Sequence, residues 1–147
     1  YEPCCCTPLF DAVGTTVKKM KQHIKDIDDA AVLVTIITDG YENSSKEWNG
    51  PAIKKLIDEC KAEGWMFSFV GAGEDVIKVA MEIAITNTVV WEQTAKGTAE
   101  MFENEIQARN RFYSKLAMPC GLAMSKEERI AYKQKIADEY YNQDENC

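Results

Sequence analysis

The most constraining feature of this sequence is the apolar run Ala31–Thr38, which ends abruptly in the polar, glycine-containing segment Asp39–Ser45. The run is too short for a typical buried helix, and valine, isoleucine and threonine dominate it. Residues with apolar character at successive positions fit a strand whose two faces are both covered, as in a parallel sheet between helices. The sequence therefore predicts a buried strand over Ala31–Thr38.

The polar residues that follow this run are candidates for a functional site. In open α/β sheets, ligands bind outside the carboxyl ends of the strands. The side chains placed there are Thr38, Asp39, Glu42, Asn43 and Ser44. Asp-Gly pairs and asparagine are also common turn formers, so Asp39 and Asn43 have a purely structural interpretation as well. The residues alone leave both interpretations open.

Composition limits the classes of protein and of partner. The chain has 147 residues, of which 46% are hydrophobic, which suits a single domain with a substantial core. A net charge of -7 and a pI near 4.8 argue against nucleic-acid binding, which needs clustered Lys and Arg. No apolar run reaches the roughly 20 residues that span a bilayer, and the N-terminus lacks a signal-peptide pattern. We therefore expect a cytoplasmic protein without a membrane partner, whose six cysteines are reduced thiols.

The hydrophobic periodicity predicts alternating helices and strands, which is typical of βαβ units and a parallel sheet. The first helix is expected to begin with Thr7 as N-cap and Pro8 as first residue, and to run to about Asp26. The remaining predicted elements are a helix from Asn49 to Gly64, a strand over Trp65–Val70, a helix from Asp75 to about Ile85, a strand from Thr88 to Trp91, a helix from Thr94 to near Pro119, and a helix from the capping box Ser125–Glu128 to about Tyr141.

Residues at helical spacing predict which side of each helix faces the core. In the first helix this stripe is Leu9, Val13, Val17, Met20, Ile24 and Ile27; in the second it is Ile53, Leu56, Ile57 and Cys60. In the long fourth helix it is Ala95, Ala99, Phe102, Ile106, Tyr113 and Leu116, interrupted by Arg109.

Three further sequence features are weak evidence for a functional site. Gly71-Ala-Gly73 follows a predicted strand, but Val76 replaces the third glycine of a dinucleotide fingerprint, and Glu74 and Asp75 would repel phosphate. His23 lies off the predicted apolar stripe and is expected to be solvated. Cys4-Cys5-Cys6 lacks the paired spacing of a zinc site, so packing residues or exposed thiols are expected.

Three stretches together resemble the von Willebrand factor A domain in its bacterial forms. They are Tyr1-x-Pro3 with Thr7-Pro-Leu-Phe-Asp-Ala-Val-Gly14, then Ile36-Ile-Thr-Asp-Gly-Tyr-Glu-Asn43, and then Phe69-Val-Gly-Ala-Gly-Glu-Asp75. The resemblance implies an α/β, Rossmann-like fold in which helices flank a parallel sheet, with the three C-terminal strands present. It covers residues 1–118 as a partial domain, and residues 119–147 form a C-terminal helical extension outside it.

The same resemblance implies a metal-ion-dependent adhesion site. Thr7 matches the threonine of the family's second loop and Asp39 the aspartate of its third, with Asn43 and Ser44 as further candidates. The Asp-x-Ser-x-Ser loop of the family is absent, and the family places it on a first strand that would precede Tyr1. The chain is therefore expected to be the C-terminal part of a longer protein or a truncated form. Mg²⁺, Mn²⁺ or Ca²⁺ should bind it weakly, because two ligands leave a hard cation largely hydrated.

The expected function is a non-enzymatic binding module in which an acidic residue of a protein partner completes the cation's coordination. One alternative is a Mg²⁺-dependent hydrolase or nucleotide-handling enzyme that uses Asp39 and Glu42, and another is a structural assembly domain. The strand Ala31–Thr38 is expected to pair on one side with Trp65–Val70 and on the other with a first strand that this chain does not contain, which leaves that edge open. An open edge can pair with another chain, so the isolated chain is expected either to self-associate through Ala31–Thr38 or to fold poorly until the upstream segment is supplied.

Overall fold

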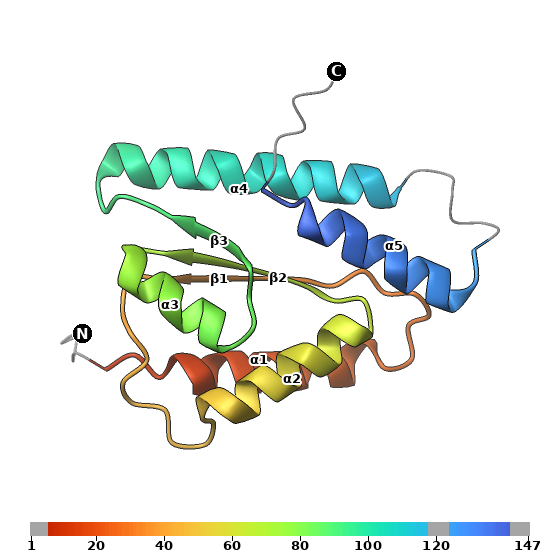
Figure 1. Ribbon diagram of the computed structural model, residues 1–147, viewed down its shortest axis with the longest axis horizontal. Coiled ribbons are helices and arrows are strands. Elements are labelled where there is room, and N and C mark those ends of the chain that lie inside the picture. The colour runs from red at the N-terminus through yellow and green to blue at the C-terminus, as the bar shows by residue number, and fades with distance from the viewer. Residues whose placement is uncertain (1–5, 118–123, 142–147) are drawn as a thin grey trace.

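The computed structural model describes residues 6–117 and 124–141, which form a parallel sheet between two layers of helices (Figure 1). In chain order the elements are α1 (Leu9–Ile24), β1 (Leu33–Thr38), α2 (Gly50–Ala62), β2 (Met66–Gly71), α3 (Glu74–Glu82), β3 (Asn87–Val90), α4 (Ala95–Leu116) and α5 (Lys126–Asp138). The predicted order of helices and strands is confirmed throughout the described residues. Cys4 and Cys5 lie outside them, and Cys6 is exposed.

The sheet has the order β1-β2-β3, and both pairs are parallel. Leu33 is opposite Met66 at the start of the first pair, and Thr38 is opposite Gly71 at its end. Helix α2 connects β1 to β2, and α3 connects β2 to β3. This arrangement confirms the predicted α/β class and the predicted pairing of the first two strands, and it is compatible with a Rossmann-like fold.

The most buried strand is β2, where every residue is buried, rather than β1. In β1 only Ile36 and Thr38 are buried, and 44% of the Ile37 surface is exposed. The prediction that Ala31–Thr38 is a buried strand covered on both faces is therefore confirmed only in part: helices contact both faces, but most of the strand is half-buried. The physical reason is position: β2 has a neighbour on each side, whereas no strand among the described residues pairs with the outer edge of β1.

One face of the sheet is covered by α1, α2 and α3, side by side. Lys21 of α1 forms an ion pair of 2.7 Å with Glu63 at the end of α2. Lys61 of α2 donates a hydrogen bond to the carbonyl of Ala84, which follows α3. Helix α2 therefore lies between the other two. Its predicted core stripe is confirmed, since Ile53, Leu56, Ile57 and Cys60 are all buried.

Helices α4 and α5 cover the opposite face (Figure 1). Ala108 and Phe112 of α4 pack against Met66 of β2, together with Ile136 and Tyr140 from α5 and the residues after it. The predicted capping box at Ser125 and Glu128 begins α5. The predicted boundary between residues 118 and 119 lies outside the described residues.

The core-facing side of α4 differs from the prediction. Met101, Glu105, Ala108 and Phe112 are its buried residues. The predicted stripe is turned outward instead, with Phe102 at 50%, Ile106 at 58% and Tyr113 at 44% exposure. The helix is rotated by one residue because the buried position at 105 is a glutamate, which a search for apolar periodicity counts as a surface residue.

The predicted stripe of α1 is confirmed only in part. Leu9, Val13 and Val17 are buried. Met20 is 39% exposed, and Ile27, beyond the end of the helix, is 55% exposed. His23 is exposed, as predicted. No helix within the described part of the chain is both long and apolar enough to cross a membrane.

Candidate functional site

Thr7 lies against the loop that follows β1, at the carboxyl end of the sheet. The Thr7 N–H donates to Asn43 Oδ1 over 2.8 Å, and the Asn43 N–H donates to the Thr7 carbonyl over 3.3 Å. A Cβ added to Gly40 would lie only 2.7 Å from Thr7 Oγ1, so the hydroxyl sits where only glycine leaves room. The structure thus brings Thr7 together with the loop that carries Asp39, whose side chain is exposed.

Asn43 and Ser44, the further candidates in this loop, differ in their hydrogen bonds. Asn43 Oδ1 already accepts the hydrogen bond from Thr7, so its role in the structure is to hold Thr7. The Ser44 hydroxyl oxygen is buried and has no hydrogen-bond partner within the described residues. The turn itself is fixed by Thr38, whose hydroxyl donates to the Gly40 carbonyl and accepts from the Gly40 N–H.

The start of α1 is capped by this loop rather than by Thr7. Pro8 occupies the N-cap position and no side chain of its own segment makes a capping bond, so the predicted N-cap role of Thr7 was wrong. Instead Glu42 Oε2 accepts from the Phe10 N–H over 2.7 Å, and Ser45 Oγ accepts from the Asp11 N–H over 3.0 Å. The two N–H groups at the helix start are thereby satisfied from a distant segment.

Glu42 also organises its own loop. Its Oε1 accepts from the backbone N–H groups of Ser44 and Ser45 over 3.0 and 2.8 Å, and its Oε2 accepts from the Ser45 hydroxyl over 2.7 Å. Burial alone would raise the pKa of the Glu42 carboxyl, but these bonds and the one from Phe10 together lower it. Both carboxylate oxygens of Glu42 are therefore engaged in holding the loop and the helix together.

Asp11 makes the reciprocal contact from the helix to the loop. Its carboxylate accepts from the N–H groups of Lys46, Glu47 and Trp48 over 2.8 to 2.9 Å. The bond from Lys46 is the largest cause of a lowered Asp11 pKa. A Cβ on Gly14 would lie 2.3 Å from the Trp48 ring, so this ring rests directly on the helix backbone. Both segments carry an acidic residue, Glu42 in the loop and Asp11 in the helix. Which N–H groups each carboxylate binds depends on the tertiary contact.

The candidate metal ligands at this edge are oxygen atoms. The Asp39 carboxylate and the Thr7 hydroxyl are of the type that Mg²⁺ prefers, and Mg²⁺ is commonly held by one or two carboxylates with water completing the octahedron. Within residues 6–117 and 124–141, no group of three or more His, Cys, Asp or Glu side chains is arranged to hold a metal ion. The described residues therefore form no closed metal site.

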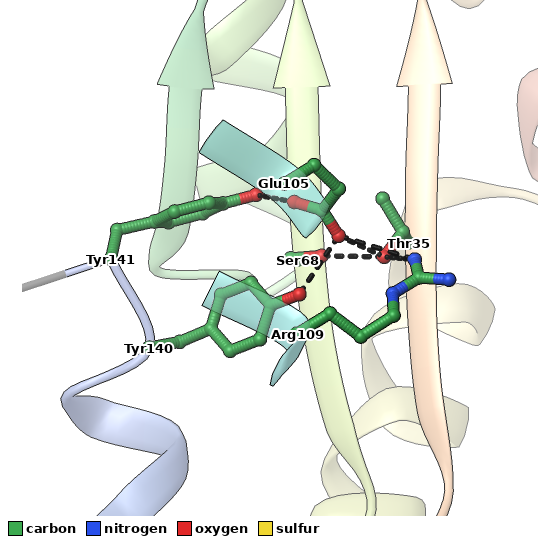
Figure 2. A network of polar contacts seen from close by, with 6 residues as sticks. All are labelled: Thr35, Ser68, Glu105, Arg109, Tyr140 and Tyr141. Atoms are coloured by element: carbon green, nitrogen blue, oxygen red, sulfur yellow. Dashed lines mark hydrogen bonds and ion pairs between the residues drawn. The ribbon is translucent and has the colours of Figure 1, made fainter. Parts of the chain in front are cut away.

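A second polar cluster, which the sequence analysis missed, lies between the sheet and α4 (Figure 2). Glu105 is only 5% exposed. Its Oε1 accepts from the Thr35 hydroxyl over 2.8 Å, from the Tyr140 hydroxyl over 2.8 Å and from the Arg109 guanidinium over 3.2 Å. Its Oε2 accepts from the Tyr141 hydroxyl over 2.8 Å. One carboxylate thus joins β1, α4 and the residues after α5.

The hydroxyls of the two strands complete this network. Thr35 Oγ1 accepts from the Ser68 hydroxyl and from Arg109, each over 3.0 Å. Burial is the largest cause that raises the pKa of Tyr140 and of Tyr141, and the neighbouring Glu105 carboxylate raises both further. A signal existed in the sequence, because Thr35 and Ser68 are polar residues in otherwise apolar strands. The network joins the residues after α5 to the sheet.

The fold and the site define an α/β protein with a parallel sheet and an oxygen-rich loop at its carboxyl edge. Comparisons with protein-family models, with curated proteins and with solved structures gave no match.

Proposed function

We propose that this chain is a non-enzymatic binding module of the von Willebrand factor A type, with a partial metal-ion-dependent adhesion site at the carboxyl edge of the sheet. The observation that carries the proposal is the contact of Thr7 with Gly40 and Asn43, in the loop that begins at Asp39. Thr7 and Asp39 are far apart in sequence, and their convergence supports the resemblance that selected them. We place the module in the cytoplasm, where its thiols stay reduced.

In this proposal Asp39 and Thr7 are the chain's own cation ligands. Mg²⁺, Mn²⁺ or Ca²⁺ bound there would supply a positive charge that an acidic residue of a partner protein can bind. The Asn43 side chain holds the Thr7 backbone, and Gly40 gives the Thr7 hydroxyl its space. Glu42 holds the loop against α1 through Phe10 and Ser45, so that Asp39 is carried on a fixed turn.

Calorimetric titration with Mg²⁺ and with Mn²⁺ tests the site. We expect a Kd on the order of 1 mM, at the weak end for hard divalent cations in proteins. Asp39→Ala should abolish the binding, and Thr7→Val should weaken it while leaving the Thr7 backbone bonds in place. Asp58→Ala is the matched control, because Asp58 is an exposed carboxylate on α2. Binding that survives Asp39→Ala would show that the ligands lie elsewhere.

The enzymatic alternative depends on Glu42 acting together with Asp39. The hydrogen bonds that Glu42 accepts from Phe10, Ser44 and Ser45 favour a structural role for it instead. A turnover screen against phosphoesters and nucleotides with Mg²⁺ separates the two functions, and we expect no turnover. Absence of any metal affinity in a longer form of the protein would favour the third function, a structural assembly domain.

A further inference from the structure

A cavity of about 630 Å³ lies at the amino end of the sheet, where the chain enters β1 and β2. Four segments form its walls: the end of α1, the connection that leads into β1, the end of α2 and the first turns of α5. Lys133 of α5 donates to the Asp29 carboxylate over 2.7 Å and so holds α5 against this connection (Figure 1). A cavity of this size suits a small organic molecule.

Part of the cavity lining is apolar. Trp65 is only 4% exposed and belongs to the core between the sheet and α1, against which Ile24 and Ala30 pack. Ile130 of α5 is half-buried, and Ile27 in the connection before β1 is 55% exposed. The cavity therefore offers apolar surface that the hydrocarbon part of a ligand can cover.

Positive charge exceeds negative charge around this cavity. The whole chain carries a net charge of -7, but five basic and only three acidic side chains line the cavity. The acidic ones are Asp28, Asp29 and Glu63, and the basic ones are Lys21, Lys25, Lys126, Arg129 and Lys133. Walls of low dielectric strengthen such a local field. The lining thus favours an anionic ligand in an otherwise acidic protein.

The basic residues of α1 have a structural explanation. Lys21 lies in the last turn of α1, and Lys25 is its C-cap. Positive charge is favourable there by itself, because the C-terminus of a helix carries a partial negative charge. Lys21 also forms an ion pair of 2.7 Å with Glu63. The basic side chains that call for a ligand are therefore those of α5.

The first turns of α5 direct basic side chains into the cavity. Lys126 is the first residue of α5, and Arg129 follows one turn later. The N-terminus of a helix carries a partial positive charge, so basic side chains are unfavourable there by themselves. Glu127 and Glu128, which suit a helix start, do not line the cavity. An anion in the cavity would offset the positive charge that gathers there.

Lys126 and Arg129 also lack partners. The Lys126 side chain forms no ion pair or hydrogen bond with any other described residue. Arg129 Nε is buried and has no hydrogen-bond partner in the described part of the chain, and it lies 3.5 Å from Asp29 Oδ2. Asp29 is already engaged at 2.7 Å by Lys133. A buried donor without an acceptor is rare in folded proteins, so Arg129 points to an acceptor that the chain does not supply.

From these observations we propose that the cavity at the amino end of the sheet binds a small amphiphilic anion, which combines one anionic head group with an aliphatic body. The head group binds Lys126 and Arg129, and the body covers Ile27 and Ile130. The cavity goes beyond the proposed cation site, which lies at the opposite end of the strands and would bind a charge of the opposite sign.

Titration of the full chain with octanoate, followed through amide chemical shifts by NMR, tests the proposal. Octanoate carries one carboxylate on an aliphatic chain. We expect saturable shifts among the residues that line the cavity, Ala30 and Lys126 included, with a Kd on the order of 1 mM. Octylammonium has the same chain with a positive head group, and inorganic phosphate has the charge without the chain. Both should bind at least about tenfold more weakly than octanoate.

Two variants separate the head group from the body. Lys126→Glu should weaken octanoate binding at least about tenfold, and α5 should stay folded because a negative charge suits the helix start. Ile27→Ser should weaken octanoate binding about fivefold and leave phosphate binding unchanged. The matched control is Lys54→Glu, which makes the same charge change at an exposed position of α2 outside the cavity. Urea unfolding verifies that each variant folds.

Each of the following results would overturn the proposal. Octylammonium that binds as tightly as octanoate would show that the cavity does not prefer an anion. Equal octanoate binding to Lys126→Glu and Lys54→Glu, or shifts confined to residues outside the cavity, would place the ligand elsewhere. Phosphate that binds as tightly as octanoate, with no effect of Ile27→Ser, would indicate an adventitious ion only. None of these results bears on Asp39, which is tested separately with Mg²⁺.

Discussion

Glu42 and Glu105 are both carboxylates that accept several hydrogen bonds, but they draw their donors from different distances in the chain. Glu42 binds the N–H groups of Ser44 and Ser45 in its own loop and adds one from Phe10. Every donor to Glu105 is a side chain, and apart from Arg109 all come from other elements. The first carboxylate shapes a turn and caps a helix, whereas the second joins a strand, a helix and the segment after α5.

The two sites also differ in whether water can bind the hydrogen-bond donors that removal of the glutamate would release. The Glu42 loop is partly exposed, so water can bind the N–H groups that its removal would release. The hydroxyls around Glu105 are more enclosed: Tyr140 is 2% exposed and Ser68 is fully buried. A buried polar group without a partner costs more than an exposed one. Removal of Glu105 should therefore be the more destabilising change.

The largest expected effect is that of Glu105→Ala. It removes the acceptor of two tyrosine hydroxyls and leaves the Arg109 guanidinium without its carboxylate. Arg109 is 45% exposed and can be solvated, whereas each buried hydroxyl left without its acceptor costs about 1–3 kcal/mol of unfolding free energy. Urea unfolding measures this loss, and Glu103→Ala, an exposed position on the same helix, is the control with a change near zero. A loss below that of Glu42→Ala would contradict the comparison.

The intermediate effect is that of Glu42→Ala, which should lower the free energy of unfolding by about 2 kcal/mol, the scale for hydrogen bonds to a charged group. Because the Glu42 pKa is lowered by folding, its contribution is complete above the ordinary value of 4.5 and is lost as the pH falls through the folded value. The difference between wild type and Glu42→Gln should thus shrink between pH 6 and about pH 3. Glu47→Ala is the control, because only its backbone contacts Asp11. A constant difference over this range would mean that Glu42 is not an ionised cap.

The smallest expected effect is that of Tyr141→Phe, which removes one hydroxyl donor to Glu105 Oε2. We expect a loss of about 1 kcal/mol at neutral pH. The Tyr141 pKa is raised by folding, so its contribution is complete below the ordinary value of 10.0 and is lost as the pH rises above it. Glu42 and Tyr141 should therefore show opposite pH dependence. Unfolding curves at pH 7 and pH 10.5 test this, with Tyr113→Phe on the exposed side of α4 as control.

Much of the fold follows from local patterns. The capping box at Ser125 and Glu128 begins α5, and Thr94 caps α4 through a bond from the Gly97 N–H. Gly64, with φ +87, ends α2 in the left-handed conformation that glycine adopts most readily. The convergence of Thr7 and Asp39 at one end of the sheet also followed from motif and topology. Whether this pair binds a cation remains a prediction.

The errors all arise where a residue's surroundings come from distant segments. Periodicity assigned Phe102 and Ile106 to the core because they are apolar, but the buried side of α4 is the one on which Glu105 meets Thr35 and Tyr140. The capping of α1 by Glu42 could not be predicted, because Glu42 and the Phe10 N–H that it binds are separated in the sequence by most of α1 and by β1. In the same way, β1 has the composition of a central strand, although among the described residues it lies at the edge of the sheet.

The sequence by itself determined the elements, their order and the parallel sheet, since propensity, capping and hydrophobic period act over a few residues. Only the tertiary structure decided which strand is central, which side of α4 is buried and which carboxylates serve as acceptors. Those outcomes depend on the partners that a side chain finds across the fold. A glutamate such as Glu105 is buried only because hydroxyls from β1 and from beyond α5 meet it there.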